Sequence, residues 1–189
     1  MCGKYHVSTE EENIEMRAFL AQAFSNRPDI SMRGGDVLPS LYAPVITPQA
    51  VLPMVFGVRL NQKQRLLINA RSETAGQSPL FAPMMQKNRC LIPTSFFYEW
   101  TPDKKPYLFS HPAGDSLYLA GLYKAQGAVM RFVILTRPAN ASVSSIHHRM
   151  PLILPSQELR EAWLHSPPLA QDILILQPEI DLMAQPLSA

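Results

Sequence analysis

Cys2 has the most distinctive chemistry that this sequence offers, because of where it lies. It follows Met1 and precedes Gly3, and its small side chain leaves Met1 open to removal by an aminopeptidase. Removal exposes an α-amine, with a pKa of about 8, beside a thiol with a pKa of about 8.5. An aldehyde can condense with this amine to an imine, and the sulfur can then close a thiazolidine ring. The alternative is that Cys2 is an ordinary terminal residue.

Glu99 is the second candidate, because it lies in the aromatic segment Ser95–Trp100. In a strand, Glu99 shares one face with Phe97, while Tyr98 and Trp100 share the other. An apolar environment raises the pKa of a carboxyl group toward the range useful for proton transfer. On these residues alone, a carboxylate at the end of a strand, facing water, is an equal interpretation.

His147 and Arg149 form the third candidate, within the segment Ile146–Pro151. Histidine is the acid–base residue of neutral pH, and a neighbouring arginine can hold a phosphate in a bidentate fork. Without a partner motif, a loop histidine beside a solvated arginine is the simpler interpretation. The pair His147–His148 falls short of the three or four ligands of a metal site, so we expect no metal and no cofactor.

The segment Asn69–Ala75 is the fourth candidate. It places short polar side chains and Arg71 directly after an apolar strand, which suits the rim of an anion site. The alternative is a helix cap, a role that Asn and Ser also serve.

The composition indicates a folded protein with no strong charge bias. The 189 residues suit a single domain over 1–189, with 47% apolar residues and 17% charged residues. A net charge of +2 means that any contact with nucleic acid depends on a local patch. Two cysteines make no disulfide framework, and no apolar run is long enough to span a membrane. We therefore expect a soluble, cytoplasmic protein with no membrane partner.

The pattern of apolar residues predicts short strands between turns. We expect a helix over residues 8–25 capped by Ser8 or Thr9, strands between residues 44 and 138, a helix over 156–164 and a last strand over 173–176. Many strands with few crossover helices predict an α+β fold: a mainly antiparallel, barrel-like sheet with a few peripheral helices.

Seven motifs in a fixed order carry a family resemblance. They are Met1–Gly3, Asn69–Thr74, Arg89–Pro93 with Phe97–Trp100, Lys105–Tyr107, Ala120–Tyr123, Leu135–Asn140 and Ile146–Pro151. Together they resemble the SOS response-associated peptidase (SRAP) family, over residues 2 to about 155. The resemblance implies a protein that binds abasic sites in single-stranded DNA, most simply as a monomer near the bacterial nucleoid. It also implies a covalent thiazolidine cross-link, with lyase-like chemistry, that shields the lesion.

The resemblance assigns roles residue by residue. Cys2 matches the terminal nucleophile, Asn69 the residue that positions the sugar, and Glu99 the active-site carboxylate. His147, rather than His148, matches the motif histidine. The residues assigned to DNA binding are Lys4, Arg71, Trp100 and Arg149.

Four places depart from the family pattern, and one is Gly35–Pro39, which replaces the upstream Tyr-Asn-x-Ala-Pro motif of many members. Lys4 replaces the usual arginine, His148 replaces a frequent aspartate, and Phe56-Gly57 stands where many relatives carry Trp-Gly and further tryptophans. The last difference predicts base stacking that is weaker than in those relatives or is provided by other residues.

Two other functions compete with the abasic-site hypothesis. In the first, Cys2, His147 and Glu99 form the set of a cysteine-type peptidase that processes itself. In the second, the chain is a non-covalent single-stranded DNA-binding module.

Overall fold

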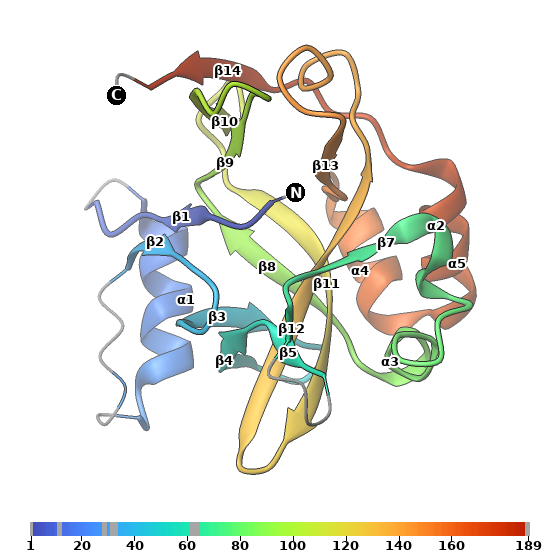
Figure 1. The fold of residues 1–189 in the computed structure, drawn as a ribbon. Helices are drawn as coiled ribbons and strands as arrows, with labels where there is room; N and C mark the ends of the chain where they lie inside the picture. The colour runs from blue at the N-terminus through green and yellow to red at the C-terminus, as the bar shows by residue number, and fades with distance from the viewer. Residues whose placement is uncertain (1, 11–12, 28–29, 31–33, 61–64, 188–189) are drawn as a thin grey trace.

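A closed five-stranded barrel forms the centre of the molecule (Figure 1). The computed structural model describes residues 2–10, 13–27, 30, 34–60 and 65–187. The barrel strands, in order of pairing, are β11 (Leu117–Gln126), β8 (Arg89–Thr94), β3 (Tyr42–Ile46), β4 (Val51–Phe56) and β12 (Val129–Pro138). Only β4 and β12 run parallel among these neighbouring pairs, and β12 pairs with β11 to close the ring. The expected mainly antiparallel, barrel-like α+β fold is confirmed.

Strand alternation divides the apolar side chains of the barrel between two cores. In β12, Phe132 and Ile134 belong to one core, and Val133 and Leu135 belong to the other. Because successive side chains of a strand point to opposite faces, the barrel fills its interior and also presents an apolar outer surface. Cys2 lies in the first core, which brings the N-terminal segment against the barrel.

A second sheet lies beside the barrel and carries the N-terminal strand. Its strands, in order, are β14 (Met183–Pro186), β10 (Pro106–Ser110), β9 (Phe96–Trp100), β1 (Tyr5–Val7) and β2 (Gly35–Val37). Two further strands, β7 (Asn69–Arg71) and β13 (Arg149–Pro151), pair with the end of β12. β5 (Val58–Arg59) and β6 (Leu66–Leu67) form a separate ribbon. The long strand β12 therefore joins β7 and β13 to the barrel.

The helices lie on two sides of the sheets (Figure 1). Of the helices in the described part of the chain, α1 (Ile14–Phe24) lies on one side, and the other four lie on the opposite side. Those four are α2 (Ser72–Ala75), α3 (Ala82–Lys87), α4 (Gln157–His165) and α5 (Pro167–Leu176). Within the described ranges, no helix is both long enough and apolar enough to cross a membrane.

Two local predictions from sequence were wrong. The first helix starts at Ile14 rather than at residue 8, because the Asn13 side chain caps it by accepting a hydrogen bond from the Met16 N–H at 3.1 Å. Residues 173–176 form the end of α5 rather than a strand. Ser166 caps α5, and its buried residues Ala170, Ile173 and Leu174 follow helical spacing.

Arg89 joins β8 to the ends of two helices. Its buried guanidinium donates to the carbonyls of Met85 and Gln86 in α3 at 2.6 and 3.0 Å, and to those of Trp163 and Leu164 in α4 at 2.5 and 3.1 Å. These carbonyls lie at helix C-termini, where the helix leaves them without an internal partner. A single side chain therefore satisfies four acceptors away from water.

We expect Arg89→Met to lower the free energy of unfolding by about 3 kcal/mol or more, since buried acceptors lose their donors. Arg89→Lys keeps the charge but loses the planar fork, and its effect should be intermediate. Urea unfolding followed by circular dichroism measures both changes. A stability equal to wild type in Arg89→Met would contradict this account.

Candidate active site

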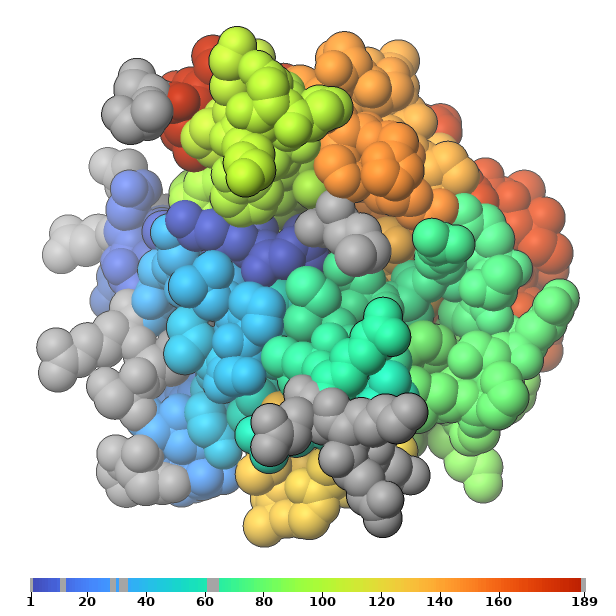
Figure 2. Space-filling model, viewed as in Figure 1, coloured from blue at the N-terminus to red at the C-terminus, as the bar shows by residue number. Residues whose placement is uncertain are grey.

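Four segments that lie far apart in the sequence meet at the N-terminal end of the chain. Cys2 precedes β1, Asn69 begins β7, Glu99 lies in β9, and His147 lies just before β13. In Figure 2 the blue N-terminal segment lies between the yellow-green strands β9 and β10, the orange 139–148 loop and the blue-green β7–α2 segment. Asn69 contacts Cys2, His147 contacts Glu99, and Glu99 lies near Cys2, so the four residues gather in one site.

Cys2 is fully buried, and a hydrogen bond to its backbone carbonyl holds it in place. The Asn69 side-chain amide donates to the Cys2 carbonyl at 3.1 Å, and the Cys2 Sγ lies 4.0 Å from the Lys4 carbonyl. Burial raises the pKa of the Cys2 thiol well above its usual value, and the nearby Glu99 carboxylate raises it further. The sulfur is therefore kept as a neutral thiol until a reaction removes its proton.

Glu99 is a buried carboxyl group with only 1% of its surface exposed. It lies opposite Tyr107 in the pairing of β9 with β10, within the aromatic segment that the sequence indicated. Loss of solvent on burial raises the pKa of Glu99 to about 7. Both of its protonation states are therefore populated at neutral pH, which suits a group that must take up and release protons.

His147 lies against Glu99 and is fixed by the backbone that follows it. Its Nδ1 is 3.9 Å from Glu99 Oε2, 2.9 Å from the Arg149 carbonyl and 3.0 Å from the Arg149 backbone nitrogen. Burial lowers the pKa of His147, so the imidazole is mainly neutral at pH 7. The exposed His148 ring stacks on it, with 4.5 Å between the ring centroids.

The two arginines expected to contact phosphate differ in their surroundings. Arg71 is exposed at the end of β7. Arg149 forms a two-pronged ion pair with Glu73, in which Nη2 lies 2.9 Å from Oε2, and it also donates to the Thr136 carbonyl at 2.5 Å. Arg149 is thus already neutralised by a carboxylate, whereas Arg71 is open to an anion.

Lys4 lies in a polar cluster on β1, β2 and β9. Its Nζ is 2.7 Å from Asp36 Oδ2 and 4.2 Å from the centroid of the Tyr98 ring. Asp36 also accepts a hydrogen bond from the Tyr98 hydroxyl at 2.9 Å and contacts His6 Nδ1 at 2.8 Å. Trp100 is half-buried at the end of β9, with 6.3 Å between its ring centroid and that of Tyr98.

Glu73 and Asp36 were not predicted as site residues. Glu73 is part of the motif that contains Arg71, but its contact with Arg149 spans 76 residues and leaves no local pattern. Asp36 lies in β2, and its contacts with His6 and Tyr98 span 30 and 62 residues, so they leave no local pattern either. Among the described residues, no group of three or more His, Cys, Asp or Glu side chains is arranged to hold a metal ion.

This combination of fold and residues is that of a known family. The model of the family "SOS response associated peptidase (SRAP)" matches residues 1–188, and the chain belongs to that family. Similar curated proteins include the abasic site processing protein YoqW of Bacillus subtilis, 32% identical over 59% of this chain and 54% of that protein. Another is the abasic site processing protein HMCES of Gallus gallus, 29% identical over 64% of this chain and 45% of that protein. The chain spans about half the length of these relatives.

Solved structures share the fold. A protein from Bordetella bronchiseptica superposes with a TM-score of 0.78 at 23% identity, over 100% of both chains. A protein from Bacteroides thetaiotaomicron superposes with a TM-score of 0.76 at 24% identity, over 97% of this chain and 92% of that one. At these identities the likeness establishes the architecture alone.

Proposed function

We propose that this protein binds abasic sites in single-stranded DNA and links to them covalently through Cys2 after removal of Met1. Met1 lies outside the described residues, so its removal is part of the proposal. The observation that carries the proposal is the burial of Cys2 beside Glu99, whose pKa is about 7, in a site that also contains a mainly neutral His147. The names of the curated relatives support the same substrate.

The first step is attack of the Cys2 α-amine on C1′ of the open sugar aldehyde. The nitrogen loses a proton as the C–N bond forms, and the carbinolamine hydroxyl must gain one to leave as water. Glu99 can do both, because its two protonation states are similar in energy near pH 7. The product of this step is an imine between the chain and the DNA.

The second step is addition of the Cys2 sulfur to the imine carbon. The thiol proton goes to the imine nitrogen, and the ring closes as a thiazolidine, so the whole reaction releases one water. The sulfur and nitrogen belong to the same residue, and Asn69 fixes the carbonyl of that residue at 3.1 Å. Such positioning supplies much of the rate gain in reactions between oriented groups.

His147 and Asn69 act on the sugar before the attack. When His147 Nδ1 donates to the Arg149 carbonyl at 2.9 Å, Nε2 is the unprotonated nitrogen of the neutral ring. It can take the proton of the C1′ hydroxyl and pass it to the ring oxygen as the sugar opens, so the ring ends neutral. Asn69 Oδ1 is a buried acceptor that has no hydrogen-bond partner among the described residues. A sugar hydroxyl at this position would satisfy Asn69 Oδ1.

The DNA backbone is held mainly by Arg71. Because Arg71 is exposed while Arg149 is paired with Glu73, Arg71→Ala should lower the slope of log affinity against log salt by about 0.7. Arg149→Ala should change that slope less. Fluorescence anisotropy with an intact single strand measures the slopes, and Arg17→Ala, an exposed arginine of α1, is the matched control. Equal slopes for Arg71→Ala and Arg17→Ala would contradict the assignment.

The test of the proposed function uses two oligonucleotides that differ by one base. The purified protein should form a denaturation-resistant product with a single strand that holds one abasic site, and none with the intact strand. A non-covalent binding module would bind both strands equally and form no such product. A cysteine-type peptidase would cleave an unrelated peptide in a Cys2-dependent way, and the raised pKa of the Cys2 thiol is opposite to that of protease nucleophiles.

A further inference from the structure

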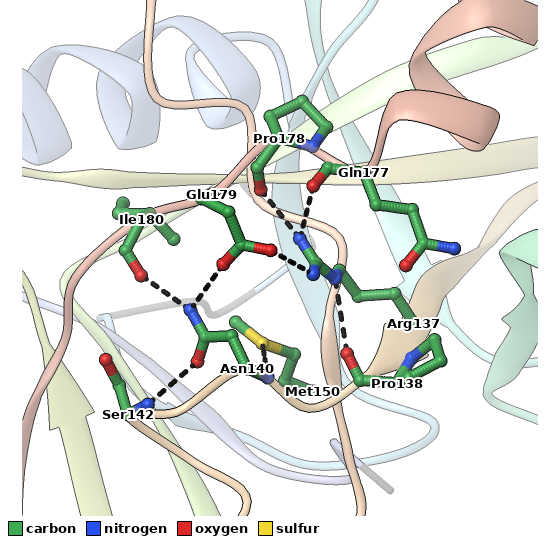
Figure 3. Close-up of polar contacts among 9 residues, drawn as sticks. All are labelled: Arg137, Pro138, Asn140, Ser142, Met150, Gln177, Pro178, Glu179 and Ile180. Carbon is green, nitrogen blue, oxygen red and sulfur yellow. Dashed lines mark hydrogen bonds and ion pairs between the residues drawn. The ribbon is translucent and has the colours of Figure 1, made fainter.

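We propose that residues 177–187, called the C-terminal strap, hold the His147 side chain in its position beside Glu99. This inference rests on the proposed function, because it assigns the strap to the same reaction as a positioning element. Figure 3 shows the polar network that joins the strap to the 137–142 segment. The network lies outside the group of residues that would touch the DNA sugar.

The first attachment is Arg137, a buried arginine at the end of β12. Its guanidinium donates to the carbonyls of Gln177 and Pro178 at 2.6 and 2.8 Å, and to Glu179 Oε1 at 2.5 Å (Figure 3). Only 7% of the Arg137 side chain is exposed. Charge-assisted hydrogen bonds of this kind are the strong ones, so the start of the strap is fixed to the barrel.

The second attachment is Asn140, which begins the loop that carries His147. Its Nδ2 donates to Glu179 Oε2 at 3.2 Å and to the Ile180 carbonyl at 2.8 Å, while its Oδ1 accepts the Ser142 N–H at 3.1 Å (Figure 3). One amide side chain therefore contacts the strap through its donor and shapes the loop through its acceptor.

Two consecutive turns connect Asn140 to His147. The Asn140 carbonyl accepts the Ser144 N–H at 2.9 Å, and the Val143 carbonyl accepts the His147 N–H at 3.0 Å. Val143 and Ile146 are buried, which holds these turns against the core. A displacement at Asn140 is therefore passed along backbone hydrogen bonds to His147.

The other end of the strap reaches the strand that carries Glu99. β14 pairs with β10, where Pro186 lies opposite Tyr107, and Tyr107 lies opposite Glu99 in β9. The strap thus contacts both halves of the site, the His147 loop and the Glu99 sheet. These halves meet where His147 Nδ1 lies 3.9 Å from Glu99 Oε2.

The test is Asn140→Asp, which keeps the acceptor for Ser142 and replaces the amide donor by a carboxylate facing Glu179 and the Ile180 carbonyl. We expect cross-link formation at saturating abasic DNA to slow by about 10- to 100-fold, the scale of a misplacement near 1 Å. Affinity for an intact single strand should not change. The control is Glu161→Gln, which removes an exposed carboxylate paired with His165 at 3.3 Å and should leave the rate as in wild type.

A rescue variant separates positioning from general damage. Adding Glu179→Gln to Asn140→Asp restores an amide–carboxylate hydrogen bond in the reverse direction, and the amide oxygen of the introduced glutamine remains an acceptor for Arg137. We expect the double variant to recover most of the lost rate. In a His147→Ala background, Asn140→Asp should change the rate by less than about twofold, because the group that it positions is absent.

The outcomes are distinguishable. A wild-type protein that forms no cross-link overturns the proposed function and the role of the strap with it. Equal cross-linking rates for wild type and Asn140→Asp would overturn the role of the strap alone. The same follows if Asn140→Asp slows cross-linking as much in the His147→Ala background as it does in wild type. If Asn140→Asp fails to fold, Glu179→Ala is the test instead, because it alters a side chain that is 68% exposed. Cross-linking by Glu179→Ala at the wild-type rate would then overturn the role of the strap.

Discussion

Replacement of Cys2 by alanine is expected to abolish the stable cross-link to abasic DNA. Alanine also permits removal of Met1, so the variant keeps the α-amine and loses only the sulfur. An imine should still form, and borohydride should trap it. Without borohydride no product should survive denaturation, because an imine hydrolyses and only the sulfur closes the ring.

The matched control for Cys2→Ala is Cys90→Ala. Cys90 is equally buried in the same core, and burial raises the pKa of its thiol in the same way. Its backbone nitrogen is an amide, however, so it cannot form a thiazolidine. We expect Cys90→Ala to cross-link as wild type does. A stable, non-reduced product from Cys2→Ala would show that the proposed nucleophile is wrong.

Glu99→Gln is expected to slow cross-linking by about 10²- to 10⁴-fold, the usual contribution of a general acid–base group. Glutamine has nearly the same shape, so binding of an intact strand should not change. In wild type, the rate of imine formation should rise with pH as Glu99 loses its proton near pH 7. In the variant, only the rise that follows deprotonation of the Cys2 α-amine, near pH 8, should remain. A variant as fast as wild type would remove Glu99 from the mechanism.

The same substitution should stabilise the fold at alkaline pH. The pKa of Glu99 is about 7 in the folded protein, above the ordinary value of 4.5. The folded state therefore binds the proton more tightly, and its stability falls as pH rises from about 4.5 to about 7 and remains reduced above that range. Glutamine avoids this loss, so the variant should gain up to about 3 kcal/mol at pH 8 and nothing at pH 4.

Thermal unfolding of wild type and Glu99→Gln at pH 4 and pH 8 tests the sign. A gain at pH 8 together with a loss of cross-linking is the pattern of a group kept for function at a cost in stability. Equal melting temperatures of wild type and Glu99→Gln at pH 8 would mean that the buried Glu99 carboxylate does not destabilise the fold.

Many strands were predictable because they are short apolar runs between turn residues. The run over β12 and the aromatic run over β9 both appear in the sequence as strands. Residues 173–176 misled the prediction, because a four-residue apolar run fits a strand and the end of a buried helix equally well. The short helices α2 and α3 gave no periodic signal.

The sequence indicated Cys2, Glu99 and His147, which the structure brings together, but it did not indicate the residues that hold them. Cys2, Glu99 and His147 have distinctive chemistry, and motif order brought them together in the prediction. The ion pair between Arg149 and Glu73 depends on tertiary contact across 76 residues, and so does the network of Arg137 with Glu179, across 42 residues. Such contacts leave no local spacing in the sequence.

The most direct test of the central claim is one intact-mass spectrum of the protein, with and without single-stranded DNA that holds one abasic site. The account predicts a free chain that lacks the mass of Met1. After denaturation without borohydride, it also predicts an adduct whose mass is that of the chain plus the DNA, less one water, in wild type but not in Cys2→Ala. A chain that retains Met1 and still forms this adduct would contradict the account.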